Sequence, residues 1–282
     1  MPAIDYEAEY NNRARVPEHQ EIFNRWDREA MDYRGKARRA RNADLGLSYG
    51  STERQIIDLF RPAANDSGSL ALFVHGGYWR SLQPSTFSHV ARGLNAHGVT
   101  VAIVGYDLAP RVSIAEIVRQ IRQSCRFLFE RFGQRMLVYG HSAGGHLAAC
   151  MVGTDWTEID SMLPADLTPV GMAVSGLFDL KPLLGVSMNS DLRLTEDHAA
   201  RLSPVDWPVG ADRTLDVAVG GLESSEFLRQ SRMIAEVWKK QGADTLYHEL
   251  PGANHFTALD PLTDPGSVLT ARLVTLSKRI AA

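Results

Sequence analysis

The chain has 282 residues, of which 44% are hydrophobic and 22% charged, as is typical of a globular protein. A formal net charge of −3 argues against nucleic-acid or anionic-membrane partners, since both select basic proteins. No stretch reaches the roughly 20 apolar residues of a membrane span, and the acidic first residues do not resemble a secretory signal. We therefore expect a cytoplasmic protein in which Cys125 and Cys150 are reduced core thiols.

Residues 1–45 are polar with scattered aromatic residues, and they are predicted to form an N-terminal extension. Pro17 opens a predicted helix in this extension. One face of that helix carries Ile22, Phe23, Trp26 and Ala30. Such aromatic residues either pack onto the domain or cover a pocket, and we expect the extension to pack near the site entrance. The basic residues 34–41 are predicted to form a solvated face.

Strand and helix signals alternate from residue 55 onward, as a mostly parallel sheet with helices on both faces requires. The predicted strands are residues 55–60, 70–74, 99–104, 136–139, 169–174, 215–219 and 245–250. The predicted helices are residues 85–97, 113–132, 145–152, 225–241 and a last one after Pro265. Residues 177–208 interrupt the alternation and predict short helices inserted above the sheet as a small cap. Residues 1–282 are thus expected to form a single α/β domain.

The segment Gly140-His141-Ser142-Ala143-Gly144 lies between a predicted strand and a predicted helix. This G-x-S-x-G pattern is typical of the nucleophile elbow of α/β-hydrolases, where a sharp turn exposes the serine. The flanking glycines avoid a clash where strand and helix nearly touch, and the helix N-terminus favours an anion beside the serine. The pattern predicts Ser142 as a nucleophile; a simple helix N-cap serine is the alternative.

A serine nucleophile needs a base, which in this fold is a histidine in the loop after the last strand. Among the nine histidines, His255 lies in such a loop, directly after residues 245–250. His248 falls within that strand and is more typical of a half-exposed or packed residue. His255 is therefore the predicted base.

The acid of the triad is expected after the preceding strand, residues 215–219. Glu223 lies in that turn and is predicted to hold the base in the correct tautomer. Glu226 falls in the first turn of the next helix, where carboxylates often only complement the helix dipole, and Asp216 belongs to the strand itself. Both remain alternatives to Glu223.

An oxyanion hole is the third requirement. Ala143, which follows the nucleophile, offers one main-chain N–H. The turn after residues 70–74 reads His75-Gly76-Gly77-Tyr78-Trp79, which matches the HGG-type loop that supplies the others. Gly76, Gly77 and Tyr78 are therefore candidate oxyanion-hole residues, and a plain tight turn is the alternative. Both motifs occur in the order that the fold demands, which predicts a serine hydrolase.

The HGGYW loop and the GHSAGGH elbow resemble those of the kynurenine formamidase (arylformamidase) branch of α/β-hydrolases, which is close to hormone-sensitive-lipase-like esterases. Further matches are residues 106–110, 175–180 and 252–256, so the similarity extends from about residue 45 to the C-terminus. The resemblance implies hydrolysis of N-formylkynurenine, with Ser142 as nucleophile and His255 as base. The family's acid is typically Asp, whereas this chain has Glu223. Trp79, Phe178 and Phe256 are expected either to line an aromatic-binding pocket or to pack in the core.

Three alternatives compete with an arylformamidase. A carboxylesterase or amidase for other small acyl substrates would use the same triad, and an inactive binding protein would use only the fold. A metal-dependent hydrolase is disfavoured because the sequence has no HExxH motif and His141 and His146 are five apart. We expect a small-molecule substrate, no metal, no cofactor and no nucleic-acid or membrane partner, with a homodimer as a possible assembly.

Overall fold

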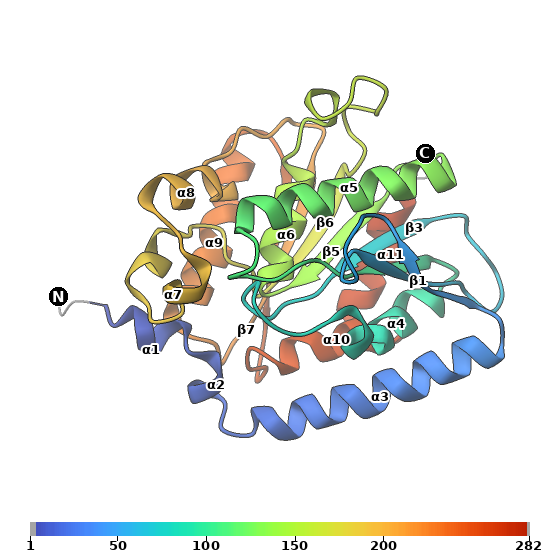
Figure 1. The fold of residues 1–282 in the computed structure, drawn as a ribbon, viewed down its shortest axis with the longest axis horizontal. Helices are drawn as coiled ribbons and strands as arrows, with labels where there is room; N and C mark the ends of the chain where they lie inside the picture. The colour runs from blue at the N-terminus through green and yellow to red at the C-terminus, as the bar shows by residue number, and fades with distance from the viewer. Residues whose placement is uncertain (1–3, 281–282) are drawn as a thin grey trace.

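The computed structural model describes residues 4–280, which are built around one eight-stranded sheet (Figure 1). The strand order is β1-β2-β4-β3-β5-β6-β7-β8. Strands β3 to β8 are parallel to one another, whereas β2 is antiparallel to both β1 and β4. The strands are β1 Ala43–Ser48, β2 Ile56–Phe60, β3 Leu70–Val74, β4 Thr100–Val104, β5 Leu137–His141, β6 Val170–Val174, β7 Thr214–Gly220 and β8 Asp244–Leu250. This topology is the mostly parallel sheet that the sequence predicts.

Helices cover both faces of the sheet. The α-helices are α1 Tyr6–Tyr10, α2 Asn12–Arg15, α3 His19–Arg39, α4 Ala91–Asn95, α5 Ile114–Phe132, α6 Ala143–Val152, α7 Asn189–Leu192, α8 Glu196–Arg201, α9 Ser225–Lys240, α10 Asp260–Thr263 and α11 Val268–Lys278. The 3₁₀ helices are η1 Pro84–Val90, η2 Trp156–Glu158, η3 Lys181–Gly185, η4 Pro204–Asp206 and η5 Thr257–Leu259. Helices α5, α6 and α9 pack on one face, and α3, α4 and α11 pack on the other (Figure 1).

Successive side chains of each strand point to opposite faces of the sheet, so every strand contributes to the core on both sides. In β3, Leu72 and Val74 face the layer of α5 and α6, while Ala71 and Phe73 face the layer of α3 and α11. All five residues of β3 are buried, as they are in β4, β5 and β6. A strand buried on both faces is a continuous apolar run, which is why the sequence located these strands.

Helix α5 shows how local sequence fixes an element. Ser113 caps its N-terminus by accepting a hydrogen bond from the N–H of Glu116 at 3.2 Å. Gly133 ends it in the left-handed region, with φ of 66°, where glycine carries no steric penalty. The apolar spacing between these residues predicts the same helix that the structure contains.

Two sequence predictions need correction. Residues 85–97 were expected to form a single helix, but Pro84 begins the 3₁₀ helix η1 and only the short α4 is α-helical. The basic residues 34–41 are not entirely a solvated face, because Arg34 forms an ion pair with the fully buried Asp58 of β2. Strand β1 was missed, since its half-exposed residues and the positive φ of Gly46 give no clear apolar pattern.

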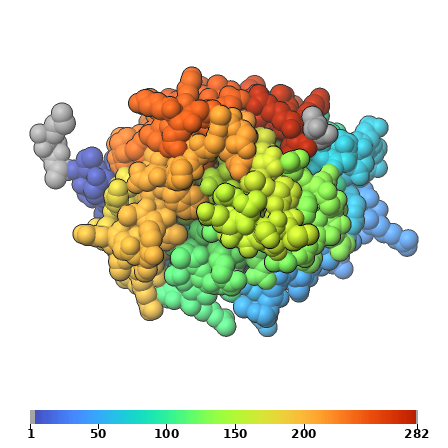
Figure 2. Space-filling view, turned by 90° about the horizontal axis from the view of Figure 1, so that it is seen from above, coloured from blue at the N-terminus to red at the C-terminus, as the bar shows by residue number. Residues whose placement is uncertain are grey.

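Residues 177–208 contain the short helices η3, α7, α8 and η4. Both overall views place this segment, coloured yellow to orange, at the same end of the molecule as α1 (Figures 1 and 2). A direct contact joins them, because the carboxylate of Glu7 accepts hydrogen bonds from the N–H and the hydroxyl of Ser187 at 2.7 and 2.8 Å. Within residues 4–280, no helix combines the length and apolar character needed to cross a membrane.

Candidate active site

Ser142 lies on a sharp turn between β5 and α6. Its backbone has φ of 58° and ψ of −121°, a conformation that costs a non-glycine residue about 1–3 kcal/mol. A Cβ added at Gly144 would lie 1.9 Å from the carbonyl oxygen of Val74, and one at Gly140 would lie 2.2 Å from that of Gly144. Only glycine therefore permits this close approach of strand and helix, which holds the strained serine in place.

The three residues predicted as a triad meet at the carboxyl end of the sheet. The Oγ of Ser142 is 3.0 Å from the Nε2 of His255, and the Nδ1 of His255 is 2.6 Å from the Oε2 of Glu223. With Nδ1–H donating to the carboxylate, Nε2 is free to accept the serine proton. All three residues are buried, with exposed fractions of 3, 4 and 7%, so their mutual hydrogen bonds are shielded from water.

Both oxygens of the Glu223 carboxylate take part in hydrogen bonds. Its Oε1 accepts hydrogen bonds from the hydroxyl of Ser175 at 2.5 Å and from the N–H of Gly220 at 2.7 Å. Ser175 follows β6 and has φ of 52°, which turns its side chain toward the end of β7. One oxygen of the Glu223 carboxylate thus reaches His255 while the other oxygen stays anchored.

The alternative acids are engaged elsewhere. Glu226 accepts a hydrogen bond from the hydroxyl of Tyr10 at 2.8 Å and forms an ion pair with Arg229 at 2.7 Å. Asp216 forms an ion pair with Arg272, and His248 lies 3.3 Å from it. His248 is therefore a packed strand residue, as its position in the sequence indicates.

The loop after β3 lies directly against the nucleophile. A Cβ at Gly76 would be 3.0 Å from the Cβ of Ser142, and one at Gly77, with φ of 109°, would be 2.4 Å from the carbonyl oxygen of Ser81. Tyr78 and Trp79 are also left-handed, with φ of 49° and 55°. In the part of the chain that the structure describes, the N–H groups of Gly77, Tyr78 and Ala143 donate to no protein acceptor. Donors without partners beside Ser142 suit an oxyanion.

Two buried histidines fix the surroundings of the nucleophile. Burial lowers the pKa of His75 to about 4, so its ring is neutral and its Nδ1–H donates to the carbonyl of Gly76 at 2.8 Å. Burial, followed by the neighbouring His255, lowers the pKa of His141 to about 3. The neutral His141 donates from Nε2 to the main-chain carbonyl of His255 at 2.7 Å. These two hydrogen bonds fix the main chain of the oxyanion loop at Gly76 and the main chain of the base at His255.

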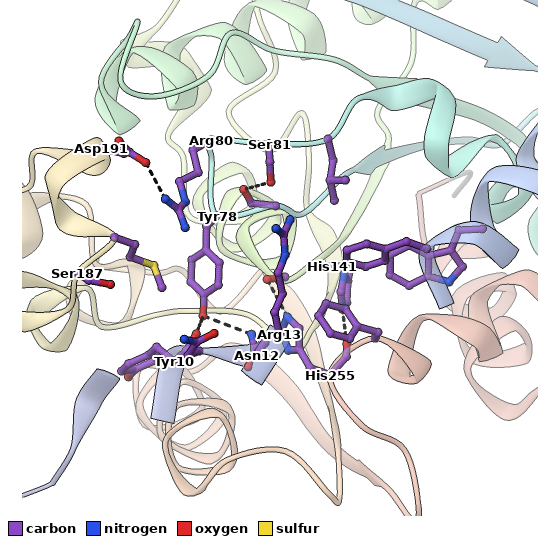
Figure 3. Close-up of a pocket in the computed structure, with 18 of the residues that line it drawn as sticks. Tyr10, Asn12, Arg13, Tyr78, Arg80, Ser81, His141, Ser187, Asp191 and His255 are labelled. Atoms are coloured by element: carbon purple, nitrogen blue, oxygen red, sulfur yellow. Dashed lines mark hydrogen bonds and ion pairs between the residues drawn. The ribbon is translucent and has the colours of Figure 1, made fainter. Parts of the chain in front are cut away.

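A cavity of about 370 Å³ opens beside Ser142 and His255 (Figure 3). Its wall combines the oxyanion loop, the cap and the N-terminal extension. The residues that line it are Glu7, Tyr10, Asn11, Asn12, Arg13, Phe23, Trp26, Gly77, Tyr78, Arg80, Ser81, Leu82, Phe87, His141, Ser142, Ser187, Met188, Asp191, His255 and Phe256. Within residues 4–280, no group of three or more His, Cys, Asp or Glu side chains is arranged to hold a metal ion.

Of the three aromatic residues proposed for the pocket, only Phe256 lines it. Trp79 is fully buried and packs edge-on against His146, with ring centroids 5.1 Å apart. Phe178 is fully buried in the core that joins β6 and β7 to α9, and its ring fills the space beside Gly176. For both residues, the prediction of a pocket role is wrong and the core alternative holds. The left-handed backbone of Trp79 turns its side chain away from the cavity and into the core.

Comparison with known proteins agrees with this geometry. A family profile described as an alpha/beta hydrolase fold matches residues 71–259. The kynurenine formamidase of Danio rerio is 30% identical over 247 residues, which cover 85% of this chain and 83% of the relative. That of Salmo salar is 31% identical over 82% of this chain and 80% of the relative. This chain belongs to the kynurenine formamidase family of α/β-hydrolases. A crystal structure from Silicibacter sp., named as a candidate thioesterase, is 35% identical with a TM-score of 0.84, covering 99% of this chain and 100% of that one.

Sequence reasoning missed three contributions to this kynurenine formamidase-family site. Ser175 was noted only as part of a matching segment, and its contact with Glu223 depends on strand order. His141 occupies a variable position of the elbow motif, so nothing in the motif indicated its bond to His255. The N-terminal extension was expected near the entrance, but no signal showed that residues 10–13 would line the cavity beside Ser142.

Proposed function

We propose that this protein hydrolyses N-formylkynurenine, a small aryl formamide, to kynurenine and formate. The observation that carries the proposal is the continuous hydrogen-bonded path from Ser142 through His255 to Glu223 beside an aromatic-lined cavity. Membership of the kynurenine formamidase family supports the choice of a formamide. The chemistry needs only an acyl transfer to serine and then to water.

The geometry supports a two-step reaction. Ser142 attacks the formyl carbon as its proton passes to Nε2 of His255, and the oxyanion meets the N–H groups of Gly77, Tyr78 and Ala143. The imidazolium, stabilised by Glu223, then gives that proton to the departing aniline nitrogen, which leaves a formyl ester on Ser142. A water molecule, deprotonated by His255, attacks the ester, and formate leaves as Ser142 regains its proton.

The cavity suits an aryl substrate with a charged tail. Phe23, Trp26 and Phe256 form an aromatic wall whose ring centroids lie 5.0–6.1 Å apart, and Phe256 is 5.3 Å from the ring of His255. An aryl formamide placed against this wall would have its formyl group near the base. A volume of about 370 Å³ matches a small ligand, since such sites hold roughly 300–1,000 Å³.

Arg13 offers a partner for the carboxylate of the substrate. It lies over the ring of Phe23, with its guanidinium carbon 5.7 Å from the ring centroid, and Figure 3 draws it extending from α2 across the cavity lining. Arg80, the other arginine of the lining, is already paired with Asp191 at 2.6 Å. A guanidinium binds a carboxylate through two parallel hydrogen bonds, so we assign the amino-acid carboxylate to Arg13.

A small-acyl esterase, amidase or thioesterase is the second candidate, favoured by the Silicibacter sp. relative named as a candidate thioesterase. The test compares kcat/KM on N-formylkynurenine, p-nitrophenyl acetate and an acetyl thioester. We expect the formamide to be preferred. A formamide rate near the uncatalysed background, with rapid ester or thioester turnover, would establish the second candidate instead.

A cytoplasmic location forms part of the proposal. Cys125 and Cys150 are both free and fully buried, as reduced core thiols are in a reducing compartment. Fractionation of the native source, followed by assay of formamidase activity in each fraction, tests this location. Activity confined to an exported or membrane fraction would contradict it.

A further inference from the structure

The side chain of Tyr78 carries a contact that the proposed reaction leaves unused. Its main-chain N–H is one of the oxyanion donors, and its backbone is held in the left-handed region with φ of 49°. Its hydroxyl donates to the main-chain carbonyl of Tyr10 at 2.6 Å and accepts from the Nδ2 of Asn12 at 3.3 Å. Figure 3 shows the side chain reaching from the oxyanion loop to the N-terminal residues. A loop residue in a strained conformation is thus secured from outside its loop.

Tyr10 is itself anchored on the opposite side of the site. It is fully buried, and its hydroxyl donates to Glu226 at 2.8 Å and accepts from the Nε2 of Gln230 at 2.6 Å. Its ring packs against Phe227 with centroids 5.7 Å apart, and Phe227 packs against the ring of His255 at 4.7 Å. One residue of α1 therefore connects the base and the oxyanion loop.

Acidic residues bind the rest of α1 to the domain. Glu9 accepts from the hydroxyl of Ser225 at 2.8 Å and from the N–H of Glu226 at 2.9 Å, at the N-terminus of α9. Glu7 accepts from the N–H and the hydroxyl of Ser187 in the cap. Since α1 has only five residues, these contacts rather than helix propensity hold it in place.

We propose that residues 6–12 act as a strap that positions the oxyanion hole, with Tyr10 and Asn12 as positioning residues acting through the hydroxyl of Tyr78. This inference rests on the serine-hydrolase mechanism proposed above, but not on the formamide as substrate. Loss of the hydroxyl would let the left-handed backbone at Tyr78 relax, and its N–H would shift from the position of the oxyanion. The displaced N–H would stabilise the transition state less, which lowers kcat. Contacts with the bound substrate, and therefore KM, stay largely unchanged.

Tyr78→Phe tests the strap, with Tyr49→Phe as the matched control. The hydroxyl of Tyr49 also donates to a main-chain carbonyl, that of Gly105 at 2.6 Å, but Tyr49 does not line the cavity. Both variants are assayed with p-nitrophenyl acetate, at a temperature where circular dichroism shows them folded. We expect Tyr78→Phe to lower kcat about tenfold with KM within about twofold, and Tyr49→Phe to leave both unchanged. Equal kcat values for the two variants would overturn the proposal.

Two further measurements separate positioning from general stability. Affinity for an aryl trifluoromethyl ketone, whose adduct with Ser142 places an oxyanion in the hole, falls in Tyr78→Phe by the same factor as kcat/KM. Tyr10→Leu, which loosens the anchor of the strap, lowers kcat as well, and the double variant loses less than the product of the two single losses. Unchanged ketone affinity, or losses that multiply independently, would show that the strap does not act through Tyr78. Should formamide turnover be absent, the ester assay still decides this inference.

Discussion

The hydroxyl of Ser175 donates a 2.5 Å hydrogen bond to Oε1 of Glu223, the carboxylate oxygen that does not contact His255. Ser175→Ala removes this bond and leaves Gly220 as the anchor. A hydrogen bond to a charged group contributes about 1.5–3 kcal/mol, and we expect part of that to appear as a roughly tenfold loss of kcat. Ser124→Ala is the control, because it removes another buried serine bond, on α5. Equal activity of the two variants would show that Gly220 alone orients Glu223.

The position of the triad acid predicts very different effects for two neighbouring glutamates. Glu223→Gln keeps the shape of the side chain but cannot stabilise the imidazolium, so kcat should fall about 10³–10⁴-fold. Glu226→Gln alters contacts with Tyr10 and Arg229 outside the triad, and we expect a loss below tenfold. Steady-state kinetics of both variants on one substrate checks this. Comparable losses would mean that the acid is misassigned.

Arg13→Gln should weaken binding of substrates that carry a carboxylate. We expect kcat/KM for N-formylkynurenine to fall about tenfold or more, with little change for formanilide, which has no carboxylate. Arg15→Gln serves as the control, since Arg15 is exposed on the same short helix and does not line the cavity. A similar loss on both substrates would show that Arg13 contributes packing rather than charge recognition.

Asp216 predicts a pH-dependent contribution to stability. Burial by itself would raise the pKa of Asp216, but hydrogen bonds from His248 and Arg272 outweigh it and lower the pKa. A lowered folded-state pKa stabilises the protein above the unfolded value near pH 4. That stabilisation is lost as the pH falls through the folded-state pKa. We expect Asp216→Asn to lower the free energy of unfolding by about 3 kcal/mol at pH 7, because it removes a fully buried carboxylate that pairs with the half-buried Arg272.

Urea unfolding at pH 7 and at pH 3 measures this contribution. The difference between wild type and Asp216→Asn should shrink at pH 3, because this pH lies below the unfolded-state pKa near 4 and the lowered folded-state pKa of Asp216 then contributes less to stability. Asp27→Asn, at an exposed position of α3, should show no such dependence. A difference that stays constant between the two pH values would contradict the prediction.

The sequence alone determined strands β2 to β8 of the sheet, the elbow and the order of the triad. Buried parallel strands are continuous apolar runs, and the elbow needs glycine where backbones nearly touch. Both features can therefore be recognised in a short stretch of sequence. Ser142, His255 and Glu223 could be named because each follows a strand whose carboxyl end lies at the same edge.

Only the tertiary structure decided what surrounds these residues. Trp79 and Phe256 are both aromatic residues beside a motif, yet one fills the core and the other lines the cavity. Tyr10 contacts Tyr78, which lies 68 positions later in the sequence, and Glu226, which lies 216 positions later. Local patterns record backbone conformation and burial, whereas a cavity wall depends on which distant segments meet, and no short stretch of sequence encodes that.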